Sequence, residues 1–448
     1  MTCPASLDPS RARSASPIHS AIFTRRCRPW RRAEIDPLCL STTGSDRATG
    51  YGLSPKLVRR GDHLFIGWLD APEAAGAPAQ IRLGVCDVAS GALLQIQTLG
   101  AGIDNHCGPA LALDSNNRLH AMIGAHHGPF LYRWSDHPAD PDSWSAPEPL
   151  GPRNTYPSLV VDFEGTLHLL YRESGDFWRL EYRRRRPGAA WETPVPLAIS
   201  PVPGYNHFMQ SLSVGPTGHL HAVFQFHFGP TGHGADCRGR AVIYLRSEDG
   251  GDTWTYDDGI RPVLPIEFAS AQTLCRYEPS AGLHSLRVGP HTVDRDDRLW
   301  FYCSVPDAMG LLYTNHSGDW ERRDLSALTN GLDYSGGRSS AFSQAPNGDL
   351  HLLISCSPAG PTAWYDPTLE LYHLHLDAQG GRKAFRQLSI TDPDRAQWLP
   401  AIEQWDWTRP QACCNDGPFY AMTRGINAGG IGGNNTNALQ TDVWLGRL

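Results

Sequence analysis

Short apolar runs that begin with Leu or Phe recur along this chain, each directly after a cluster of turn-forming residues. Gly, Asp and Asn in the clusters favour tight turns, and the runs that follow have the length and apolar content of β-strands. Seven copies of this pattern are present, at residues 61–66, 117–122, 165–170, 218–223, 297–302, 348–353 and 417–422. Each copy predicts a turn followed by a β-strand.

Further strands are predicted between the copies, where aromatic-rich runs alternate between apolar and polar residues. These runs are residues 130–134, 178–182, 311–313, 369–374 and 441–448. No stretch keeps a helical period for more than about two turns. Most copies lie about fifty residues apart, which is typical of a β-propeller with four strands per blade. The pattern therefore predicts an all-β fold, a seven-bladed β-propeller with four-stranded antiparallel blades.

Residues 1–48 stand outside the repeat and are basic and rich in Ser and Pro. We expect a disordered N-terminal segment there and a propeller over residues 49–448, with residues 35–41 supplying the strand that completes the last blade. A signal peptide needs an apolar core of about 7 to 15 residues, which this segment lacks. We therefore expect a cytoplasmic protein, or a secreted or periplasmic one if the start codon is misassigned.

Composition limits the alternatives. The 448 residues are 40% hydrophobic, enough for a large core, and the net charge of -7 argues against nucleic acid or an anionic membrane as partner. No run approaches the roughly 18 apolar residues of a membrane span. The 11 cysteines follow no regular spacing, so a disulfide framework is not expected. We expect a monomer.

The repeat also places polar residues at one mouth of the predicted central channel. Residues just before the innermost strand of a blade and just after its second strand lie on the same face, because the two strands are antiparallel. Counting from each repeat leucine gives Tyr51, His106, His126, Tyr156, Arg172, His207, His227, His284 and Arg338. A single histidine of this kind is most often a surface or hydrogen-bonded residue, but nine residues in phase indicate a site.

These residue types point to one kind of chemistry. They supply a permanent cation, a phenol and imidazoles that titrate near neutrality, but no pair of carboxylates. Glycoside hydrolysis usually needs two Asp or Glu residues on either side of the bond. The set suits abstraction of a proton next to a carboxylate better.

Four short motifs resemble a known family. They are residues 105–109 (Asn-His-Cys-Gly-Pro), 125–128 (Ala-His-His-Gly), 154–158 (Asn-Thr-Tyr-Pro-Ser) and 170–172 (Leu-Tyr-Arg). The set resembles the seven-bladed β-propeller polysaccharide lyases of the ulvan lyase group, also called BNR-4 repeat proteins. The resemblance implies β-elimination on a uronic-acid-containing glycan, ulvan-like or rhamnose-glucuronate, with His106, His126, Tyr156 and Arg172 as catalytic residues.

Roles can be matched to these residues only in part. Arg172 would neutralise the uronate carboxylate, because the neighbouring proton is too weakly acidic beside a full anion. His126 or Tyr156 could be the base, and Tyr156 or His106 the acid. The residues expected to bind the acidic glycan are Tyr51, His127, His207, His284 and Arg338, and His127 could also replace His126.

A second group of residues follows the repeat copy at 218–223. His227, His233 and Cys237 could bind a structural zinc ion, with Cys275 or His207 as the fourth ligand. The resemblance also implies zinc in this region. The alternative is a histidine-containing loop with an inert thiol, and no organic cofactor is expected.

Residues 247–254 match the Asp-box pattern Ser-x-Asp-x-Gly-x-Thr-Trp. This motif fixes a hairpin turn in many unrelated propellers, sialidases included, so it indicates fold rather than function. Two alternatives to a lyase remain open: a sialidase-like glycoside hydrolase, for which the chain lacks a clear arginine triad, and a non-catalytic carbohydrate-binding propeller.

Overall fold

The computed structural model describes residues 37–51, 53–74, 77–278, 286–305, 308–334, 340–358, 360, 366–410, 417–426 and 440–448. The chain divides into two units, Met1–Ala33 and Glu34–Leu448. The first unit lies outside the described residues, as does most of the predicted disordered segment. All the described strands belong to the second unit.

The described residues form an all-β structure, as predicted. Their helical content is a single 3-10 turn at Pro141–Ser143, and all other regular elements are strands. No helix in these ranges is long and apolar enough to span a membrane. Each of the seven repeat copies contains the start of a strand, which confirms the pattern from which the fold was predicted.

One sheet joins the two ends of the described chain. Its strands, in hydrogen-bonded order, are β27 (Ala396–Ile402), β28 (Phe419–Ile426), β29 (Gln440–Arg447), β1 (Leu38–Gly44), β3 (His63–Asp70), β4 (Ala79–Asp87) and β5 (Leu93–Gly102), with β2 (Leu57–Arg60) also paired to β3. β1 pairs with β29 from Leu38↔Leu445 to Gly44↔Thr441 but meets β3 only at Gly44↔Asp70. An early strand therefore completes the sheet of the last three strands.

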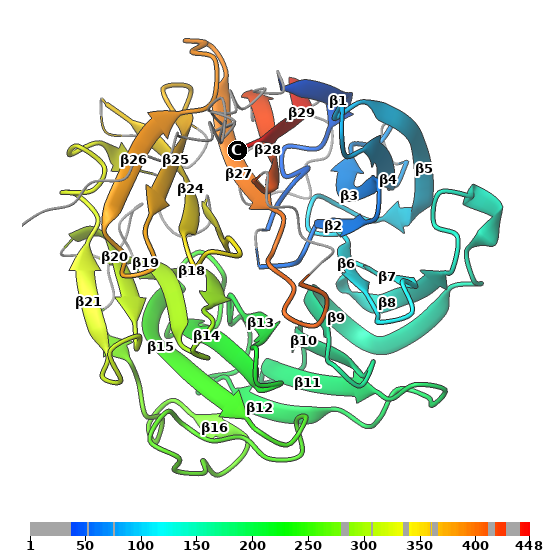
Figure 1. The fold of residues 1–448 in the computed structure, drawn as a ribbon. Helices are drawn as coiled ribbons and strands as arrows, with labels where there is room; N and C mark the ends of the chain where they lie inside the picture. The colour runs from blue at the N-terminus through cyan, green and yellow to red at the C-terminus, as the bar shows by residue number, and fades with distance from the viewer. Residues whose placement is uncertain are drawn as a thin grey trace, which may run out of the picture. The chain divides into compact units, whose positions relative to one another are not determined.

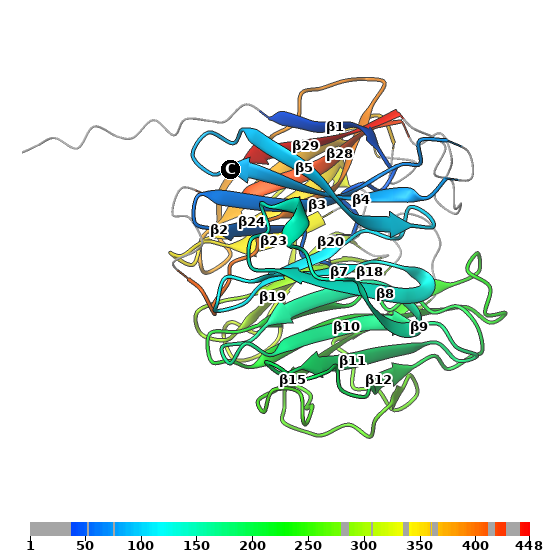
Figure 2. The same ribbon diagram turned by 90° about the vertical axis from the view of Figure 1, so that its right-hand side faces the viewer.

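A second sheet carries most of the candidate site. Its order is β16 (Ile266–Glu267), β12 (Val195–Ile199), β11 (Arg179–Arg185), β10 (Leu167–Glu173), β9 (Glu148–Val161), β8 (His126–Ser135), β7 (Leu119–Ile123) and β6 (Ala110–Leu113). β9 is 14 residues long: its first part pairs with β8 and its second part with β10. Figure 2 shows β7 to β12 of this sheet side by side.

Three smaller antiparallel sheets complete the unit. They consist of β13 (Ser211–Val214), β14 (Leu220–Phe228), β15 (Arg238–Ser247) and β17 (Cys275–Arg276); of β18 (Arg287–Val293), β19 (Leu299–Val305), β20 (Ala308–Thr314) and β21 (Glu321–Asp324); and of β22 (Asp333–Tyr334), β23 (Ser340–Gln344), β24 (Leu350–Ser357), β25 (Glu370–Leu376) and β26 (Arg382–Gln387).

The sheets follow one another in chain order around a common centre (Figure 1). Their innermost strands contact one another in the order β2, β6, β9, β13, β18, β23 and β27. The hydrophobic core lies between the faces of neighbouring sheets: Leu170 of β10, Tyr182 of β11 and Phe224 of β14 belong to one buried cluster. The unit is therefore propeller-like and built mainly of antiparallel strand pairs, with two of its sheets four-stranded.

The histidine that follows the leucine in three repeat copies is structural. In each case its Nδ1 contacts a third-strand Tyr hydroxyl at 2.7 to 2.8 Å and its Nε2 contacts an Asp carboxylate at 3.0 to 3.3 Å. The triplets are Asp114–His120–Tyr132, Asp162–His168–Tyr182 and Asp297–His221–Tyr244. His168 and Arg172 lie at opposite ends of β10, so the structural and the candidate catalytic residues occupy opposite strand ends.

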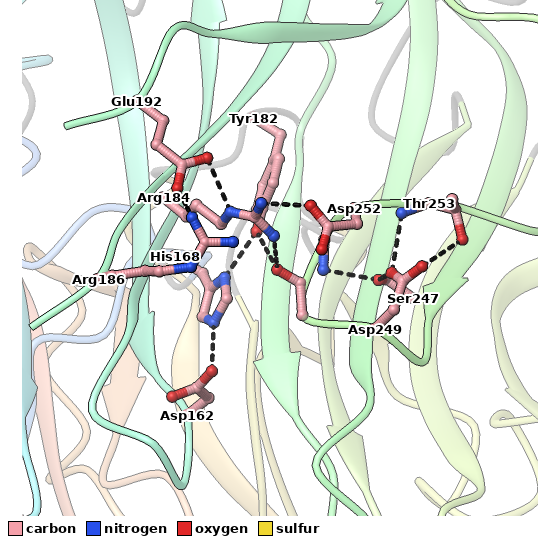
Figure 3. Close-up of polar contacts among 12 residues, drawn as sticks. Asp162, His168, Tyr182, Arg184, Arg186, Glu192, Ser247, Asp249, Asp252 and Thr253 are labelled. Carbon is pink, nitrogen blue, oxygen red and sulfur yellow. Dashed lines mark hydrogen bonds and ion pairs between the residues drawn. The ribbon is translucent and has the colours of Figure 1, made fainter.

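The turn at residues 247–254 is held by its own side chains (Figure 3). The Asp249 carboxylate accepts hydrogen bonds from the backbone N and the hydroxyl of Thr253 at 2.8 and 2.6 Å. Arg184 of β11 donates to the carbonyl of Gly250 at 2.7 Å and pairs with Asp252. The turn is therefore hydrogen-bonded to β11 of the second sheet.

Candidate active site

Three strands of the second sheet bring polar residues side by side. His126 of β8 pairs in register with Thr155 of β9, and Thr155 pairs in turn with Arg172 of β10. Because the three positions are direct cross-strand neighbours, the imidazole and the guanidinium are carried by one rigid piece of sheet. A site on paired strands is more precisely held than one on loops.

Two β-bulges flank these positions. The register shifts between His126 and Gly128 of β8 leave His127 unpaired, and the shift between Leu170 and Arg172 leaves Tyr156 in the bulge of β9. His127 has φ 57° and Tyr156 has φ 60°, in the left-handed region that side-chain-bearing residues rarely adopt. Bulges re-aim side chains and concentrate next to active sites. The bulge in β9 thus explains why the Tyr156 side chain departs from the alternation of its strand, and the bulge in β8 does the same for His127.

The described tyrosines and histidines predicted for the site form a continuous chain of rings, in which His106 also contacts Tyr51 and Tyr156. Its members are Tyr51, His106, His126, His127, Tyr156, His207 and His227. The ring centroids of His106 and His126 lie 4.0 Å apart, and Tyr156 lies 5.0 Å from both Tyr51 and His207. The structure therefore gathers these predicted residues in one place. His284 and Arg338 lie outside the described residues.

A buried carboxylate joins the two stacked imidazoles. Asp104 is 0% exposed, and its Oδ1 contacts Nδ1 of His106 at 3.1 Å while its Oδ2 contacts Nδ1 of His126 at 2.5 Å. Burial by itself would raise the pKa of Asp104, but the hydrogen bonds from both histidines outweigh it and hold that pKa far below its ordinary value. Asp104 is therefore a carboxylate anion shared by two imidazoles.

Arg47 approaches the same cluster from the other side of His106. Its Nη1 lies 2.6 Å from the hydroxyl of Tyr51 and 2.5 Å from Nε2 of His106. Burial, and next the nearby Arg47 cation, hold the pKa of His106 well below its ordinary value. His106 is therefore neutral at physiological pH.

Arg172 is a buried cation that lacks a hydrogen-bonded anion. Its side chain is 0% exposed, and its three guanidinium nitrogens have no hydrogen-bond partner among the described residues. The guanidinium carbon lies 4.7 Å from the ring centre of Tyr156, 4.5 Å from that of Trp178 and 5.4 Å from that of Tyr205. Cation–π contacts offset only part of the cost of burying an unpaired charge. Trp178 and Tyr205 are half-buried, so these two rings separate the guanidinium from solvent.

Two neighbours of Arg172 have shifted proton affinities. Burial raises the pKa of Tyr156 well above its ordinary value, so the phenol keeps its proton. Burial, followed by the Arg172 cation, lowers the pKa of His127 to about 4. Nδ1 of His127 lies 2.5 Å from the hydroxyl of Ser174. Tyr156 is thus suited to donate a proton, and His127 stays neutral.

Four residues of this site escaped the sequence analysis: Arg47, Asp104, Trp178 and Tyr205. None occupies the counted phase of the repeat, because Arg47 lies between β1 and β2, Asp104 between β5 and β6, Trp178 directly before β11 and Tyr205 between β12 and β13. Asp104 stands two residues before His106, and this short spacing was its only local signal.

The predicted zinc ligands are not gathered as a group. Among the described residues, no three His, Cys, Asp or Glu side chains with ligand atoms within 4.8 Å of one another include His227, His233, Cys237 or Cys275. The Cys237 thiol donates to the carbonyls of Tyr205 and His233, and burial raises the pKa of Cys237 to about 11, which disfavours the thiolate that zinc requires. Cys275 hydrogen-bonds with Cys303 instead. Zinc binding by this set stays a prediction.

A possible metal-binding group does occur at Asp104, His106 and His126. Apart from Nε2 of His126, its donor atoms are already engaged among the described residues, since both carboxylate oxygens contact imidazole Nδ1 atoms and Arg47 contacts Nε2 of His106. A cation beside Arg47 would also be repelled. The arrangement fits proton transfer better than metal binding.

Comparison with known proteins gives a family and a fold. The sequence model described as "BNR repeat-containing family member" matches residues 65–328, more than half of the chain. No curated protein matches the sequence.

Two solved structures of polysaccharide lyases are similar to this chain. A polysaccharide lyase, PL25 ulvan lyase, bound to -[GlcA(1-4)Rha3S]-, matches with TM-score 0.63 and 12% identity over 92% of this chain and 95% of that chain. Polysaccharide lyase Uly1 matches with TM-score 0.60 and 11% identity over 92% of this chain and 99% of that one. At these identities the similarity establishes an ulvan lyase-like propeller fold.

Proposed function

Since this chain belongs to the BNR repeat-containing family and has an ulvan lyase-like fold, we propose that it is a polysaccharide lyase that cleaves a uronic-acid-containing glycan by β-elimination. The observation that carries the proposal is Arg172, a fully buried guanidinium without a hydrogen-bonded anion, packed against a protonated phenol. An unpaired buried cation is costly, and a uronate carboxylate would supply the missing partner.

The first step in the proposed reaction is neutralisation of the carboxylate by Arg172. The planar guanidinium can bind both carboxylate oxygens, and this lowers the cost of the enolate-like charge that develops when the C5 proton leaves. Because the guanidinium is fully buried against Trp178 and Tyr205, we expect these rings to shift when the carboxylate binds. The two rings then exclude water from the ion pair.

In the proposed proton transfers, His126 is the base and Tyr156 is the acid. His126 takes the C5 proton at Nε2, and Asp104 stabilises the imidazolium that forms, 2.5 Å from Nδ1. Tyr156 gives its phenolic proton to the glycosidic oxygen at C4 as the C4–O bond breaks and the C4–C5 double bond forms. The raised pKa of Tyr156 suits it to be the acid rather than the base. Transfer of the proton from His126 back to Tyr156 restores the starting state.

The proposed substrate is an acidic glycan, ulvan-like or rhamnose-glucuronate. The similar PL25 ulvan lyase was solved with glucuronate and sulfated rhamnose units. In this chain, Tyr51, His127 and His207 offer aromatic rings and hydrogen-bonding groups around the proposed catalytic residues. Sugar rings stack on aromatic faces, and the polar ring atoms can bind sulfate or hydroxyl groups.

We further propose that the unit is a seven-bladed propeller. Seven innermost strands contact one another in chain order, and each is followed by the strand that starts in a repeat copy. β9 would serve both as the outer strand of the second blade and as the inner strand of the third, which would explain the eight-stranded sheet that contains the site. β1 would complete the seventh blade.

The proposal is tested by incubating the protein with ulvan, a rhamnose-glucuronate glycan and other uronate polysaccharides. We expect an increase in ultraviolet absorbance from the unsaturated uronate product. Arg172→Ala and Tyr156→Phe should each lower kcat/KM by at least about a thousandfold, because each removes a transition-state contact. Arg186→Ala, at an exposed arginine paired with Glu192, is the matched control and should keep the native rate.

Two results would reject the lyase. New reducing ends without absorbance would indicate hydrolysis, as in the sialidase-like alternative. Binding of the glycan without either signal would indicate a carbohydrate-binding propeller.

A further inference from the structure

The two stacked histidines of the site differ in which ring nitrogen is engaged. Nδ1 of each contacts Asp104, at 3.1 Å for His106 and 2.5 Å for His126. Nε2 of His106 also lies 2.5 Å from Nη1 of Arg47, whereas no described residue hydrogen-bonds Nε2 of His126. Both rings keep a little exposure, 12% for His106 and 14% for His126. Similar burial means that their partners, rather than their accessibility, distinguish the two residues.

The hydrogen-bonding rules for these groups fix the proton of His106. An arginine guanidinium can only donate, so Nε2 of His106 must accept and must carry a lone pair. Its Nδ1 then carries the single proton and donates it to the Asp104 carboxylate. His106 is held as the neutral Nδ1–H tautomer, with both nitrogens occupied.

The same rules leave His126 with a free basic nitrogen. The Asp104 carboxylate accepts from Nδ1 of His126, so that Nδ1 carries a proton and Nε2 carries the lone pair. Protonation of His126 at Nε2 would create a cation next to a carboxylate, which is favourable. Protonation of His106 would place a second cation against Arg47 in a buried position, which is not.

Resting on the proposed function, we propose that Arg47 and Asp104 are positioning residues: together they lock His106 as a neutral hydrogen-bonding group and make His126 the histidine that accepts the substrate proton. Arg47 is buried and bonded to Tyr51 and His106, so it acts through His106. Asp104 acts through both rings, in the way that a carboxylate fixes the tautomer of a catalytic imidazole.

The groups that face His106 all fit this assignment. They are Arg47, Tyr51, Asp104, Cys107, His126 and Tyr156. Asp104 is the anion among them. Burial raises the pKa values of the Cys107 thiol and the Tyr156 phenol, so neither group adds a second negative charge. A single carboxylate therefore serves both imidazoles.

The test is a nitrogen–proton NMR titration of imidazole-labelled protein, with His106→Asn and His126→Asn spectra to assign the signals. In the native protein, we expect His106 to show the Nδ1–H tautomer and no titration between about pH 5 and about pH 8, the range in which ordinary histidines titrate. In Arg47→Met, His106 should begin to titrate in that range. Arg118→Met, at an exposed arginine paired with Asp136, is the control and should leave the His106 signal unchanged.

Kinetics then distinguish positioning from a purely structural role. Arg47→Met should lower kcat about tenfold or more with little change in KM, and should add an acidic limb to the pH–rate profile as His106 becomes protonated. Asp104→Asn should lower kcat further, because an amide can also stabilise the wrong tautomer of His126.

The NMR readout does not depend on lyase activity. Native His106 that titrates normally, or that carries its proton on Nε2, would overturn the proposal even if the protein cleaves glycans. The expected NMR result in a protein that cleaves no uronate glycan would uphold the tautomer assignment and reject the proposed lyase.

Discussion

At the scale of single residues, this protein buries charges that most folds avoid. Arg172 has no hydrogen-bonded anion among the described residues, and Lys56 is fully buried with a backbone carbonyl, Pro109 O at 2.7 Å, as its hydrogen-bond acceptor. Such groups lower the stability of the folded state. Buried charges that lower the stability of the fold are typical of functional sites, where activity outweighs stability.

Replacement of Arg172 should therefore stabilise the protein while it abolishes activity. We expect Arg172→Met to raise the free energy of unfolding by about 1 kcal/mol, because it removes an unpaired buried cation and keeps the packing volume. The measurement is urea unfolding. Arg184→Met is the matched contrast and should destabilise, since Arg184 pairs with Glu192 and Asp252. A loss of stability in Arg172→Met would mean that the cation–π contacts outweigh the desolvation cost.

Lys56 gives a prediction on pH. Burial lowers the pKa of Lys56 to about 7, whereas an unfolded lysine titrates at about 10.4. Between these values the unfolded chain binds more protons than the folded one, so this group makes the free energy of unfolding rise as pH increases from about 7 to about 10. Comparing native and Lys56→Met unfolding at pH values near 6 and 9 should show a smaller gain for the variant. Parallel curves would contradict the lowered pKa.

At the scale of strands and turns, the same sequence repeat serves two purposes. Its turn end holds the Asp–His–Tyr triplets and the 247–254 turn, which fasten strands to one another. Its other end holds the bulges at His127 and Tyr156, which take side chains out of the regular alternation. Stability and candidate chemistry are therefore placed at opposite ends of the strands.

The turn at 247–254 should affect stability alone. Asp249→Ala removes three hydrogen bonds, one from the side chain of Ser247 and two from the backbone and side chain of Thr253, and we expect a loss of about 1 to 3 kcal/mol in unfolding free energy. Glycan cleavage at a temperature well below unfolding should be unchanged. Glu164→Ala, in another exposed turn, is the control. Lost cleavage with unchanged stability would assign this turn a functional role.

Strands were easier to predict than the site because a strand's periodicity is local. The leading Leu or Phe of the repeat copies located seven strands, and counting from these positions selected His106, His126, Tyr156 and Arg172. The bulges could not be predicted, since a bulge depends on the register of two strands. Arg47 was hidden because its partner His106 is 59 residues away, and Asp104 because its role is visible only once two imidazoles meet on it.

At the scale of the whole unit, contacts between distant parts of the chain close the ring of inner strands. Arg59 of β2 and Glu403, directly after β27, form a buried two-pronged ion pair at 2.8 and 2.6 Å. Both residues line a cavity of about 120 Å³ between the inner strands, which none of the candidate catalytic residues lines. The cavity therefore belongs to the closure of the ring rather than to the site.

A double-mutant cycle tests this closure. Arg59→Met and Glu403→Gln should each cost about 3 to 5 kcal/mol of unfolding free energy, because each leaves a buried partner uncompensated. The double variant should cost less than the sum of the two. Additive losses would show that the pair does not couple the first and last inner strands.

The central claim is that the protein breaks a glycosidic bond by elimination rather than by adding water. The most direct measurement is mass spectrometry of the products formed from a uronate glycan in heavy-oxygen water. The account predicts fragments lighter by one water than hydrolysis products, with no heavy oxygen at the new ends, and no fragments from Arg172→Ala. Fragments that have gained a heavy oxygen atom would show hydrolysis and contradict the lyase.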